Sequence, residues 1–369
     1  MSDQIPDSSP YGDPAALGWD AAWQAEFDRV GSKTLRPVRV AAAVRGRYLV
    51  LGLAKSGGPW VSCRKRLTEL DADGSGFPVV GDWALVSGER DSIVIEQLLS
   101  RRSCFVRKAA GRDARPQILA ANVDRVFIVT AVDDDFNPRR LERYLATVWD
   151  SGTEPVIVVN KTDLAHDRAA LTGELGRVAL EARVVFCSAL EEDGLAEVLT
   201  VCEPGMTIAL VGSSGVGKST VINRLLGTER QVTADVRGGD HKGRHTTARQ
   251  ELIPTPVGAL LIDTAGLREI GLWDVEEGVR RTFADIEASA QDCRFRDCSH
   301  TGEPGCAVEA AVREGLLEQG RLDSYLRLQR EIDYTARRAD ERSARNTKRR
   351  WKQISKSRKE LNRLKKRGR

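Results

Sequence analysis

Three polar loops, each directly after a short apolar run, constrain the fold of this chain most strongly. The loops are Asn160 to Asp163 after 155–159, Gly212 to Thr220 after 207–211, and Asp263 to Gly266 after 259–262. Apolar runs of this length are typical of the buried strands of a parallel sheet, and such sheets bind ligands at the carboxyl ends of their strands. We therefore predict an α/β domain in which the three loops form one site.

The second loop has the composition of a phosphate-binding loop. It reads Gly212, Ser213, Ser214, Gly215, Val216, Gly217, Lys218, Ser219 and Thr220, which matches G-x-x-x-x-G-K-S between an apolar run and a helical segment. Glycines let backbone N–H groups turn toward phosphate oxygens at a helix N-terminus. Lys218 supplies positive charge to the outer phosphates, and the Ser219 hydroxyl can bind Mg²⁺. The alternative is a chance Gly-rich loop.

The loop that comes first in the chain has residues that can read guanine. It consists of Asn160, Lys161, Thr162 and Asp163. The Asp163 carboxylate can accept two N–H hydrogen bonds from the guanine edge, which adenine does not offer in that arrangement, while Asn160 and Lys161 brace the loops. Ser188 and Ala189, after another apolar run, would add a backbone contact to the base. Alone, an N-K-T-D turn is also a common helix start, but the phosphate-binding loop downstream favours guanine recognition.

The third loop supplies a candidate for magnesium binding. Asp263 can hold Mg²⁺ through water, and the Gly266 N–H can reach the terminal phosphate. Ras-like GTPases carry Gln at the next position to orient water, whereas this chain has Leu267, which neither donates nor accepts a hydrogen bond. We therefore expect slow intrinsic hydrolysis unless another group positions the water.

The segment 238–247, between the phosphate-binding loop and the Asp263 loop, contains such a group. Thr246 or Thr247 could complete the Mg²⁺ shell, and His245 could orient or deprotonate water near neutral pH. The alternative is a solvated loop rich in Gly and charge, whose histidines have no catalytic role.

The order of the three loops along the chain is unusual. In an ordinary GTPase the phosphate-binding loop precedes the base-reading loop, whereas here the base-reading loop comes first. Because the loops meet at one edge of the sheet, their order can change when the old chain ends are joined and the chain opens elsewhere. The sequence therefore predicts a circularly permuted P-loop GTPase domain that binds GTP and GDP.

These residues, their order and Leu267 resemble the RsgA (YjeQ) family of permuted GTPases, which act in late assembly of the small ribosomal subunit. The resemblance extends from about residue 37 to about 310; one departure is Ala265, where family members commonly have Pro. It implies an OB-fold domain before the GTPase and a zinc-binding helical domain after it. The expected domains are an N-terminal extension at 1–36, an OB-fold RNA-binding β-barrel at 37–107, the permuted GTPase at 116–275, the zinc-binding helical domain at 276–335 and a basic tail at 336–369.

A cluster of cysteines with one histidine predicts a metal site in the last third of the chain. Cys293, Cys298, His300 and Cys306 have the spacing C-x4-C-x-H-x5-C. Three thiolates and one imidazole can close a tetrahedral Zn²⁺ site with no position left for water, so the predicted zinc is structural. The alternative is a set of unliganded cysteines beside a chance histidine.

The N-terminal third gives weaker signals. Trp19, Trp23, Phe27 and Val30 recur at helical spacing and predict a helix whose aromatic side chains belong to a core. Short β-type runs separated by Gly and Asp turns follow, consistent with a small barrel. They include Val38-Arg39-Val40, Tyr48 to Leu51, Val79-Val80 and Ile93 to Ile95.

Basic residues suggest an RNA-facing surface on this barrel. They are Arg45, Arg47, Arg64, Lys65 and Arg66. A generic barrel without RNA contacts is the alternative. The segment from Arg101 to Pro116 reads as a basic linker.

Charge is concentrated at the end of the chain. The net charge of the 369 residues is only +4, yet 337–369 contains 16 Lys or Arg against 3 Asp or Glu. Such a tail predicts a structured RNA partner, because neutralising phosphates releases counterions. A solvated tail that aids solubility is the alternative. The sequence shows neither an apolar stretch of membrane-spanning length nor a signal-like start, so we expect a cytosolic protein without membrane contact. We also expect a monomer.

Together these patterns favour one function over two alternatives. We expect a GTPase that binds the small ribosomal subunit and its rRNA during late assembly, with GTP-bound and GDP-bound states that differ in subunit affinity. A different class is a nucleotide-gated RNA-binding module with incidental hydrolysis. A second alternative is a GTPase that acts on a protein partner.

Overall fold

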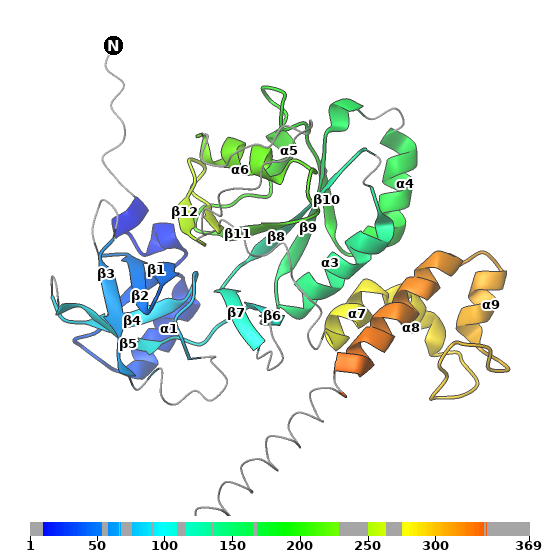
Figure 1. Cartoon of the computed structure of the whole chain (residues 1–369), viewed down its shortest axis with the longest axis horizontal. Helices are drawn as coiled ribbons and strands as arrows, with labels where there is room; N and C mark the ends of the chain where they lie inside the picture. The colour runs from blue at the N-terminus through cyan, green and yellow to red at the C-terminus, as the bar shows by residue number, and fades with distance from the viewer. Residues whose placement is uncertain are drawn as a thin grey trace, which may run out of the picture. The chain divides into compact units, whose positions relative to one another are not determined.

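The computed structural model describes residues 10–53, 58–65, 67, 76–89, 92–108, 116–133, 136–164, 168–228, 250–262, 275–335 and 337. The chain divides into two compact units (Figure 1). The first runs to Gly271 and includes Glu277–Glu287, and the second contains Leu272–Glu276 and the chain from Ala288 onward. The barrel and the large sheet both belong to the first unit.

The first described residues form two short 3-10 helices and one α-helix. These are η1 (Pro10–Gly12), η2 (Ala15–Leu17) and α1 (Ala21–Val30). Helix α1 begins after Asp20, whose side chain accepts a hydrogen bond from the Trp23 backbone N–H, and ends at Gly31, whose φ is 68°. The helix predicted from the aromatic spacing is therefore present, although Trp19 precedes it. Trp19 stacks on Trp23, which is 2% exposed, so Trp23 belongs to the core as predicted and Trp19 packs half-buried against it.

Five strands follow and close into a barrel in the order β1-β2-β3-β5-β4. They are β1 (Arg36–Val44), β2 (Arg47–Leu51), β3 (Trp60–Cys63), β4 (Trp83–Ser87) and β5 (Val94–Leu98). Alternate side chains such as Val38, Val40 and Val86 fill the interior, as period-two burial requires. The strand expected at Val79-Val80 is wrong, because Val80 makes only an isolated bridge to Ala120 and β4 starts later.

The segment expected as a linker, from Arg101 to Pro116, contains one strand of an antiparallel pair instead. Strand β6 (Cys104–Lys108) pairs with β7 (Pro116–Ala121). Val106 and Ile118 lie opposite each other in this pair, and Phe105 is 1% exposed. The abundance of basic residues concealed a strand that buries its apolar face.

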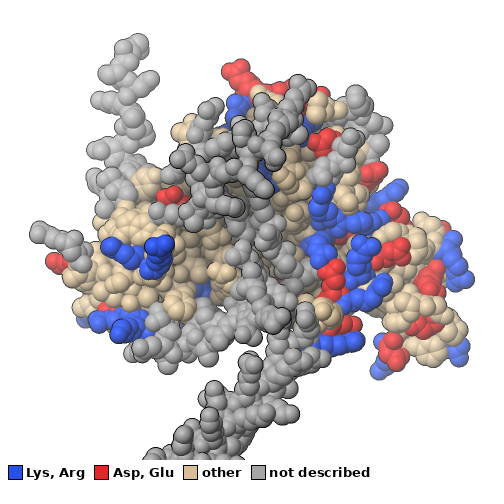
Figure 2. Space-filling model, viewed as in Figure 1, with Lys and Arg blue, Asp and Glu red and all other residues tan. Residues whose placement is uncertain are grey.

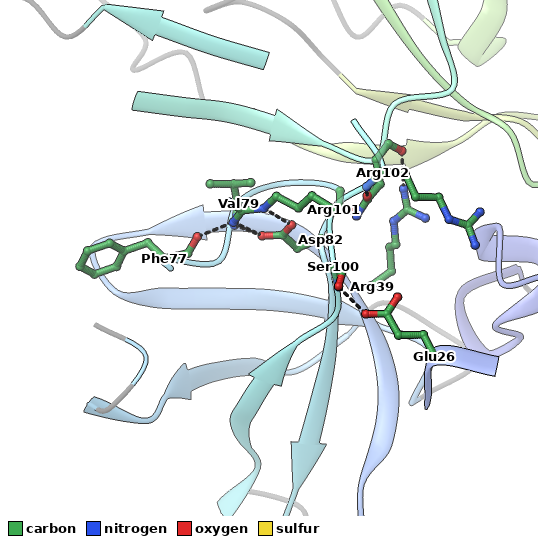
Figure 3. A network of polar contacts seen from close by, with 10 residues as sticks. Glu26, Arg39, Phe77, Val79, Asp82, Ser100, Arg101 and Arg102 are labelled. Atoms are coloured by element: carbon green, nitrogen blue, oxygen red, sulfur yellow. Dashed lines mark hydrogen bonds and ion pairs between the residues drawn. The ribbon is translucent and has the colours of Figure 1, made fainter. Parts of the chain in front are cut away.

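Polar contacts fix the chain where the barrel meets this strand pair (Figure 3). Arg101 donates from Nε and Nη2 to the two carboxylate oxygens of Asp82, at 2.7 and 2.8 Å. The backbone N–H of Ser100 donates to Glu26 on α1 at 2.7 Å. Asp82 is fully buried, and its bidentate partner compensates much of the cost of removing a carboxylate from water.

The large sheet has six strands in the order β10-β9-β8-β11-β13-β12. They are β8 (Arg125–Ala131), β9 (Glu154–Asn160), β10 (Arg183–Phe186), β11 (Thr207–Val211), β12 (Leu252–Pro254) and β13 (Leu260–Ile262). All neighbours are parallel except β12, which pairs antiparallel with β13. The carboxyl ends of five strands therefore lie along one edge.

Helices cover both faces of this sheet (Figure 1). Helices α3 (Pro138–Asp150) and α4 (Arg168–Ala179) pack on one face, and α5 (Ala196–Leu199) and α6 (Lys218–Leu226) pack on the other. On β8, Val126 and Ile128 join the cluster of α3 and α4, whereas Phe127 and Val129 join that of α5 and α6. Burial on both faces explains why the sequence shows continuous apolar runs here.

The remaining helices are α7 (Glu276–Thr282), α8 (Ala284–Ala290), α9 (Ala307–Arg313) and an unlabelled helix over 319–335. Among the described residues, no helix is long and apolar enough to cross a membrane. The predicted fold class is confirmed: an α/β sheet domain carries a five-stranded OB-like barrel before it, and a cysteine and histidine cluster follows among helices.

Candidate functional site

The parallel sheet brings the loops that follow β9, β10 and β11 together at one edge. Asn160 ends β9 and is 2% exposed. Its Nδ2 donates to the Val216 carbonyl oxygen in the loop after β11 at 2.9 Å, and its Oδ1 accepts from the Ala189 backbone N–H after β10 at 3.0 Å. One amide side chain therefore ties three loops to one another, and because it is buried, each of its contacts matters for stability.

Asp163 lies beside the loop that follows β10. The Ser188 hydroxyl donates to Asp163 Oδ1 at 2.7 Å, and Ser188 is 2% exposed whereas Asp163 is exposed. The Thr162 backbone N–H donates to the Cys187 carbonyl oxygen at 3.2 Å. The Ser188 hydroxyl thus fixes the carboxylate, while Asp163 remains exposed to solvent. A residue that recognises a ligand needs both a fixed orientation and access to that ligand.

Lys161 adopts a left-handed backbone conformation with a φ of 61°. Its ammonium group lies 2.6 Å from Asp133, which follows β8 at the same edge of the sheet. The sequence reasoning missed Asp133. The signal available was a polar residue directly after another apolar run, at 125–131, which a parallel sheet would bring to this edge.

The phosphate-binding loop has the geometry that its glycines allow. Gly212, Gly215 and Gly217 have φ of 144°, 87° and 89°. A Cβ on Gly212 would lie 2.2 Å from the Val129 carbonyl oxygen, and one on Gly217 would lie 2.2 Å from Asn160 Nδ2. Side chains are therefore excluded at both positions by space as well as by conformation.

Helix α6 starts directly at the end of this loop. Gly217 caps it without a side-chain hydrogen bond, so the first N–H groups of the helix have no side-chain cap. Lys218 is 8% exposed, and its ammonium group donates to the Ser213 carbonyl oxygen across the loop. Ser219 and Thr220 follow in the first turn, half-buried. Such a terminus attracts anions because backbone donors and the helix dipole act together.

Five of the predicted residues lie outside the described part of the chain. They are His245, Thr246, Thr247, Asp263 and Gly266. The strand before Asp263, β13, ends at Ile262 next to β11 in the sheet.

The four predicted metal ligands converge in the second compact unit. The ligand atoms of Cys293, Cys298, His300 and Cys306 all lie within 4.8 Å of one another. His300 Nδ1 lies 3.7 Å from Cys293 Sγ and 3.4 Å from Cys306 Sγ. The Ala307 backbone N–H donates to Cys293 Sγ at 3.4 Å, which is how backbone groups commonly support a thiolate. Three sulfurs and one imidazole at this spacing fit a four-coordinate metal ion.

Comparison with known proteins agrees with this arrangement. The model of the RsgA GTPase family matches residues 98–273. The small ribosomal subunit biogenesis GTPase RsgA of Opitutus terrae is 45% identical over 351 residues, which cover 92% of this chain and 95% of that protein. The protein of the same name from Methanosarcina acetivorans is 46% identical over 280 residues, covering 75% and 76%.

Two solved structures have the same architecture. YloQ, a circularly permuted GTPase, matches with a TM-score of 0.58 and 26% identity over 82% of this chain and 96% of its own. YjeQ from Thermotoga maritima matches with a TM-score of 0.61 over 81% of this chain and 98% of its own, and at 24% identity it supports the fold alone. By the extent of these matches, the order of the loops and the parallel sheet that gathers them, the chain belongs to the RsgA family of circularly permuted GTPases, enzymes that hydrolyse GTP.

Proposed function

We propose that this GTPase binds the small ribosomal subunit and its rRNA and acts in late assembly of that subunit. The observation that carries the proposal is the similarity across 92% of the chain to a protein named for small ribosomal subunit biogenesis. Along the chain, the barrel comes before the GTPase sheet and the cysteine and histidine cluster comes after it, and this order supports the proposal. The protein is proposed to work as a cytosolic monomer.

The GTP site is proposed to consist of the gathered loops. Asp163 reads the guanine edge, and Asn160 maintains the loop geometry through its contacts to Val216 and Ala189. Lys218 and the N-terminus of α6 bind the phosphates. The full proposed set is Asn160, Lys161, Thr162, Asp163, Ser188, Ala189, Gly212, Ser213, Ser214, Gly215, Val216, Gly217, Lys218, Ser219, Thr220, Asp263 and Gly266.

Two metal ions are proposed, with different roles. Mg²⁺ would be held with GTP by Ser219, Asp263 and either Thr246 or Thr247, and it would neutralise charge on the phosphates. Zn²⁺ would be held by the three cysteines and His300 described above, and a site with four protein ligands serves structure rather than chemistry. His245 is proposed to position the attacking water, because Leu267 has no hydrogen-bonding group.

The surface of the barrel is compatible with contact to RNA. Arg45, Arg47, Arg64 and Lys65 are exposed. Arg64 forms a bidentate ion pair with Glu96 at 2.9 and 3.0 Å, so it offers less of its charge to a phosphate than an unpaired arginine would. Figure 2 shows basic side chains on the largely uncharged surface of the barrel on the left, and basic and acidic side chains interspersed over the helices on the right. The basic tail at 336–369 is proposed to add further charge toward rRNA.

Multiple-turnover GTP hydrolysis, measured with and without purified small ribosomal subunits, tests the proposal. Strong stimulation by small subunits, and not by large subunits, is the expected result. Tight binding to small subunits without stimulation would favour the nucleotide-gated RNA-binding module instead. Absence of both binding and stimulation would contradict the proposed partner.

A further inference from the structure

The loop after β10 is held by a side chain that the proposed site does not include. Arg224 lies in the last turn of α6, and its Nη2 donates to the backbone carbonyl oxygens of Glu191 and, at 2.6 Å, of Glu192. Both carbonyls belong to the loop 188–194, between β10 and α5. One guanidinium nitrogen therefore connects the helix that starts at the phosphate-binding loop with the loop beside Asp163.

The loop 188–194 is compact enough to move as one piece. The Ser188 N–H donates to the Gly194 carbonyl oxygen at 3.1 Å, the Glu191 N–H to the Ser188 carbonyl oxygen at 3.0 Å, and the Gly194 N–H to the Glu191 carbonyl oxygen at 3.2 Å. A Cβ on Gly194 would lie 1.8 Å from the Ser188 carbonyl oxygen, so only glycine allows this closure. A displacement at Glu191 is thus passed to Ser188.

Ser188 is the link from this loop to the base-reading residue. Its hydroxyl donates to Asp163 Oδ1 at 2.7 Å, while the neighbouring Ala189 N–H holds Asn160 Oδ1 at 3.0 Å. A hydrogen bond to a carboxylate fixes the direction of that carboxylate, and selectivity for guanine depends on this direction. A hydrogen bond therefore joins each step from Arg224 to Asp163.

We propose that Arg224 is a positioning residue for guanine recognition, acting through the loop 188–194 on Asp163. The inference rests on the proposed role of Asp163 in reading the base. Helix α6 carries Lys218 in its first turn and Arg224 in its last. The same helix therefore fixes the position of the phosphate-binding loop relative to the loop beside Asp163. Groups that are held in their binding positions before the ligand arrives give a site higher affinity.

The decisive variant is Arg224→Ala, compared with the wild type by titration of GDP, GTP and ATP and by steady-state hydrolysis. Two hydrogen bonds from an exposed cation to backbone carbonyls correspond to a rise of about three- to tenfold in the Kd for both guanine nucleotides. ATP affinity should stay the same, so the preference for GTP over ATP falls by the same factor. The KM for GTP should rise while kcat at saturating GTP is retained. The reason is that the Arg224 guanidinium donates to the loop 188–194 rather than to the phosphate-binding loop.

Three further variants keep the test specific. Arg183→Ala is the matched control, since Arg183 is also an exposed arginine of this domain and donates to the Thr200 hydroxyl at 3.2 Å instead; it should leave all three affinities unchanged. Arg224→Lys keeps a cationic donor and should recover part of the lost affinity. Gly194→Ala disturbs the same loop by a different route and should also reduce the preference for guanine.

The outcomes separate this inference from the proposed function. Equal weakening of GTP and ATP by Arg224→Ala would indicate general damage to the fold and overturn the positioning role. An unchanged preference in Arg224→Ala, with normal selectivity in the wild type, would overturn the inference alone. A wild type that binds ATP as tightly as GTP would overturn the proposed base reader, and the inference with it.

Discussion

Arg39 shows how one side chain joins the barrel to the GTPase sheet. It lies on β1, is 2% exposed, and donates to the carbonyl oxygens of Leu17 and Asn122 and to the hydroxyl of Thr207 at the start of β11. Burial lowers its pKa to about 10, opposed by the nearby negative charges of Asp124 and Asp82, so it stays protonated at neutral pH. No partner for its Nε is found among the described residues.

Replacing this residue should therefore destabilise the first compact unit. Arg39→Met keeps most of the volume but leaves the Leu17 and Asn122 carbonyl groups without their donor, which should lower the free energy of unfolding by about 2–4 kcal/mol. Urea denaturation followed by tryptophan fluorescence measures this. A loss below about 1 kcal/mol would mean that water replaces the guanidinium without cost.

Asp163 provides the prediction for nucleotide choice. Asp163→Asn replaces one acceptor oxygen by an N–H donor, so it should weaken GTP binding and relax the preference for guanosine over xanthosine nucleotides. The Ser188 hydroxyl can turn to meet either side chain, so the fold should be retained. Competitive titration with GTP and XTP measures the ratio. An unchanged ratio would exclude Asp163 as the base reader.

At the scale of elements, helix α1 is held in place by Asp20, the residue that caps its N-terminus. Asp20 accepts from the Trp23 N–H, and its carboxylate receives both Nη groups of Arg102 at 2.6 and 2.7 Å. The Arg102 hydrogen bond lowers the pKa of Asp20 to about 2. Because the side chains are 51% and 41% exposed, solvent screens the pair and its contribution is about 1 kcal/mol or less.

Two substitutions separate the cap from the ion pair. Asp20→Asn keeps a capping oxygen and should cost up to about 1 kcal/mol at pH 7, whereas Asp20→Ala should cost about 1 kcal/mol more. The folded pKa is depressed, so the ion pair stabilises the protein above the ordinary value near 4 and loses this effect as pH falls through about 2. The difference between wild type and Asp20→Asn in urea denaturation should therefore shrink from pH 7 to pH 3. A constant difference would contradict a role of charge.

Helix α7 is docked on α3 through a glycine. A Cβ on Gly278 would lie 1.9 Å from the Ala146 carbonyl oxygen, and Arg281 lies 3.4 Å over the Trp149 ring while donating to Glu181 at 2.8 Å. Gly278→Ala should therefore displace the helix and lower stability by about 1–3 kcal/mol. Gly176→Ala on α4 is the matched control, because nothing lies within 4 Å of its Cβ position, and it should stabilise by about 0.5–1 kcal/mol. Thermal unfolding of both variants measures this, and equal effects would contradict the docking argument.

At the scale of the whole molecule, helix α7 connects the GTPase domain to the metal cluster along the chain, so it could transmit the difference between the GTP-bound and GDP-bound states. Glu277–Glu287 belongs to the unit of the GTPase sheet, whereas Cys293 belongs to the other unit. Along the chain, Cys293 is 27 residues beyond Gly266, and α7 occupies part of that length. We infer that a change in the segment after Gly266 on hydrolysis reaches the second unit through α7, as switch segments released from a terminal phosphate transmit their state in other GTPases.

Loss of the cluster should uncouple the two units. Replacing Cys298 and Cys306 by Ser should release zinc and locally unfold the second unit, because a structural zinc site with four protein ligands contributes to the free energy of folding. GTP binding should persist. Such a variant should lose the difference in small-subunit affinity between a GTP analogue and GDP, measured by sedimentation, with zinc content measured in parallel. If zinc is lost and the full difference remains, the coupling runs through another part of the protein.

The sequence alone predicted GTP binding, a zinc site and the order of the domains along the chain. Spacings such as G-x-x-x-x-G-K-S and C-x4-C-x-H-x5-C predict a function locally, because the ligand-binding groups of each motif lie within one short segment of the chain. Apolar runs predicted the parallel strands for the same reason, since burial on both faces is visible residue by residue. The strand at 104–108 was missed because its basic residues concealed a short buried face.

Only the tertiary structure decided how these parts support one another. Arg39 meets Thr207 across 168 residues, Arg224 meets Glu191 across 33, and Lys161 meets Asp133 across 28. For Arg39 and Arg224 no local pattern marks the partner, because a lone arginine has the same sequence signature whether it is paired or solvated. Their pairing follows from strand order and helix packing, which place groups that are distant in the chain within hydrogen-bond distance only after the sheet has formed.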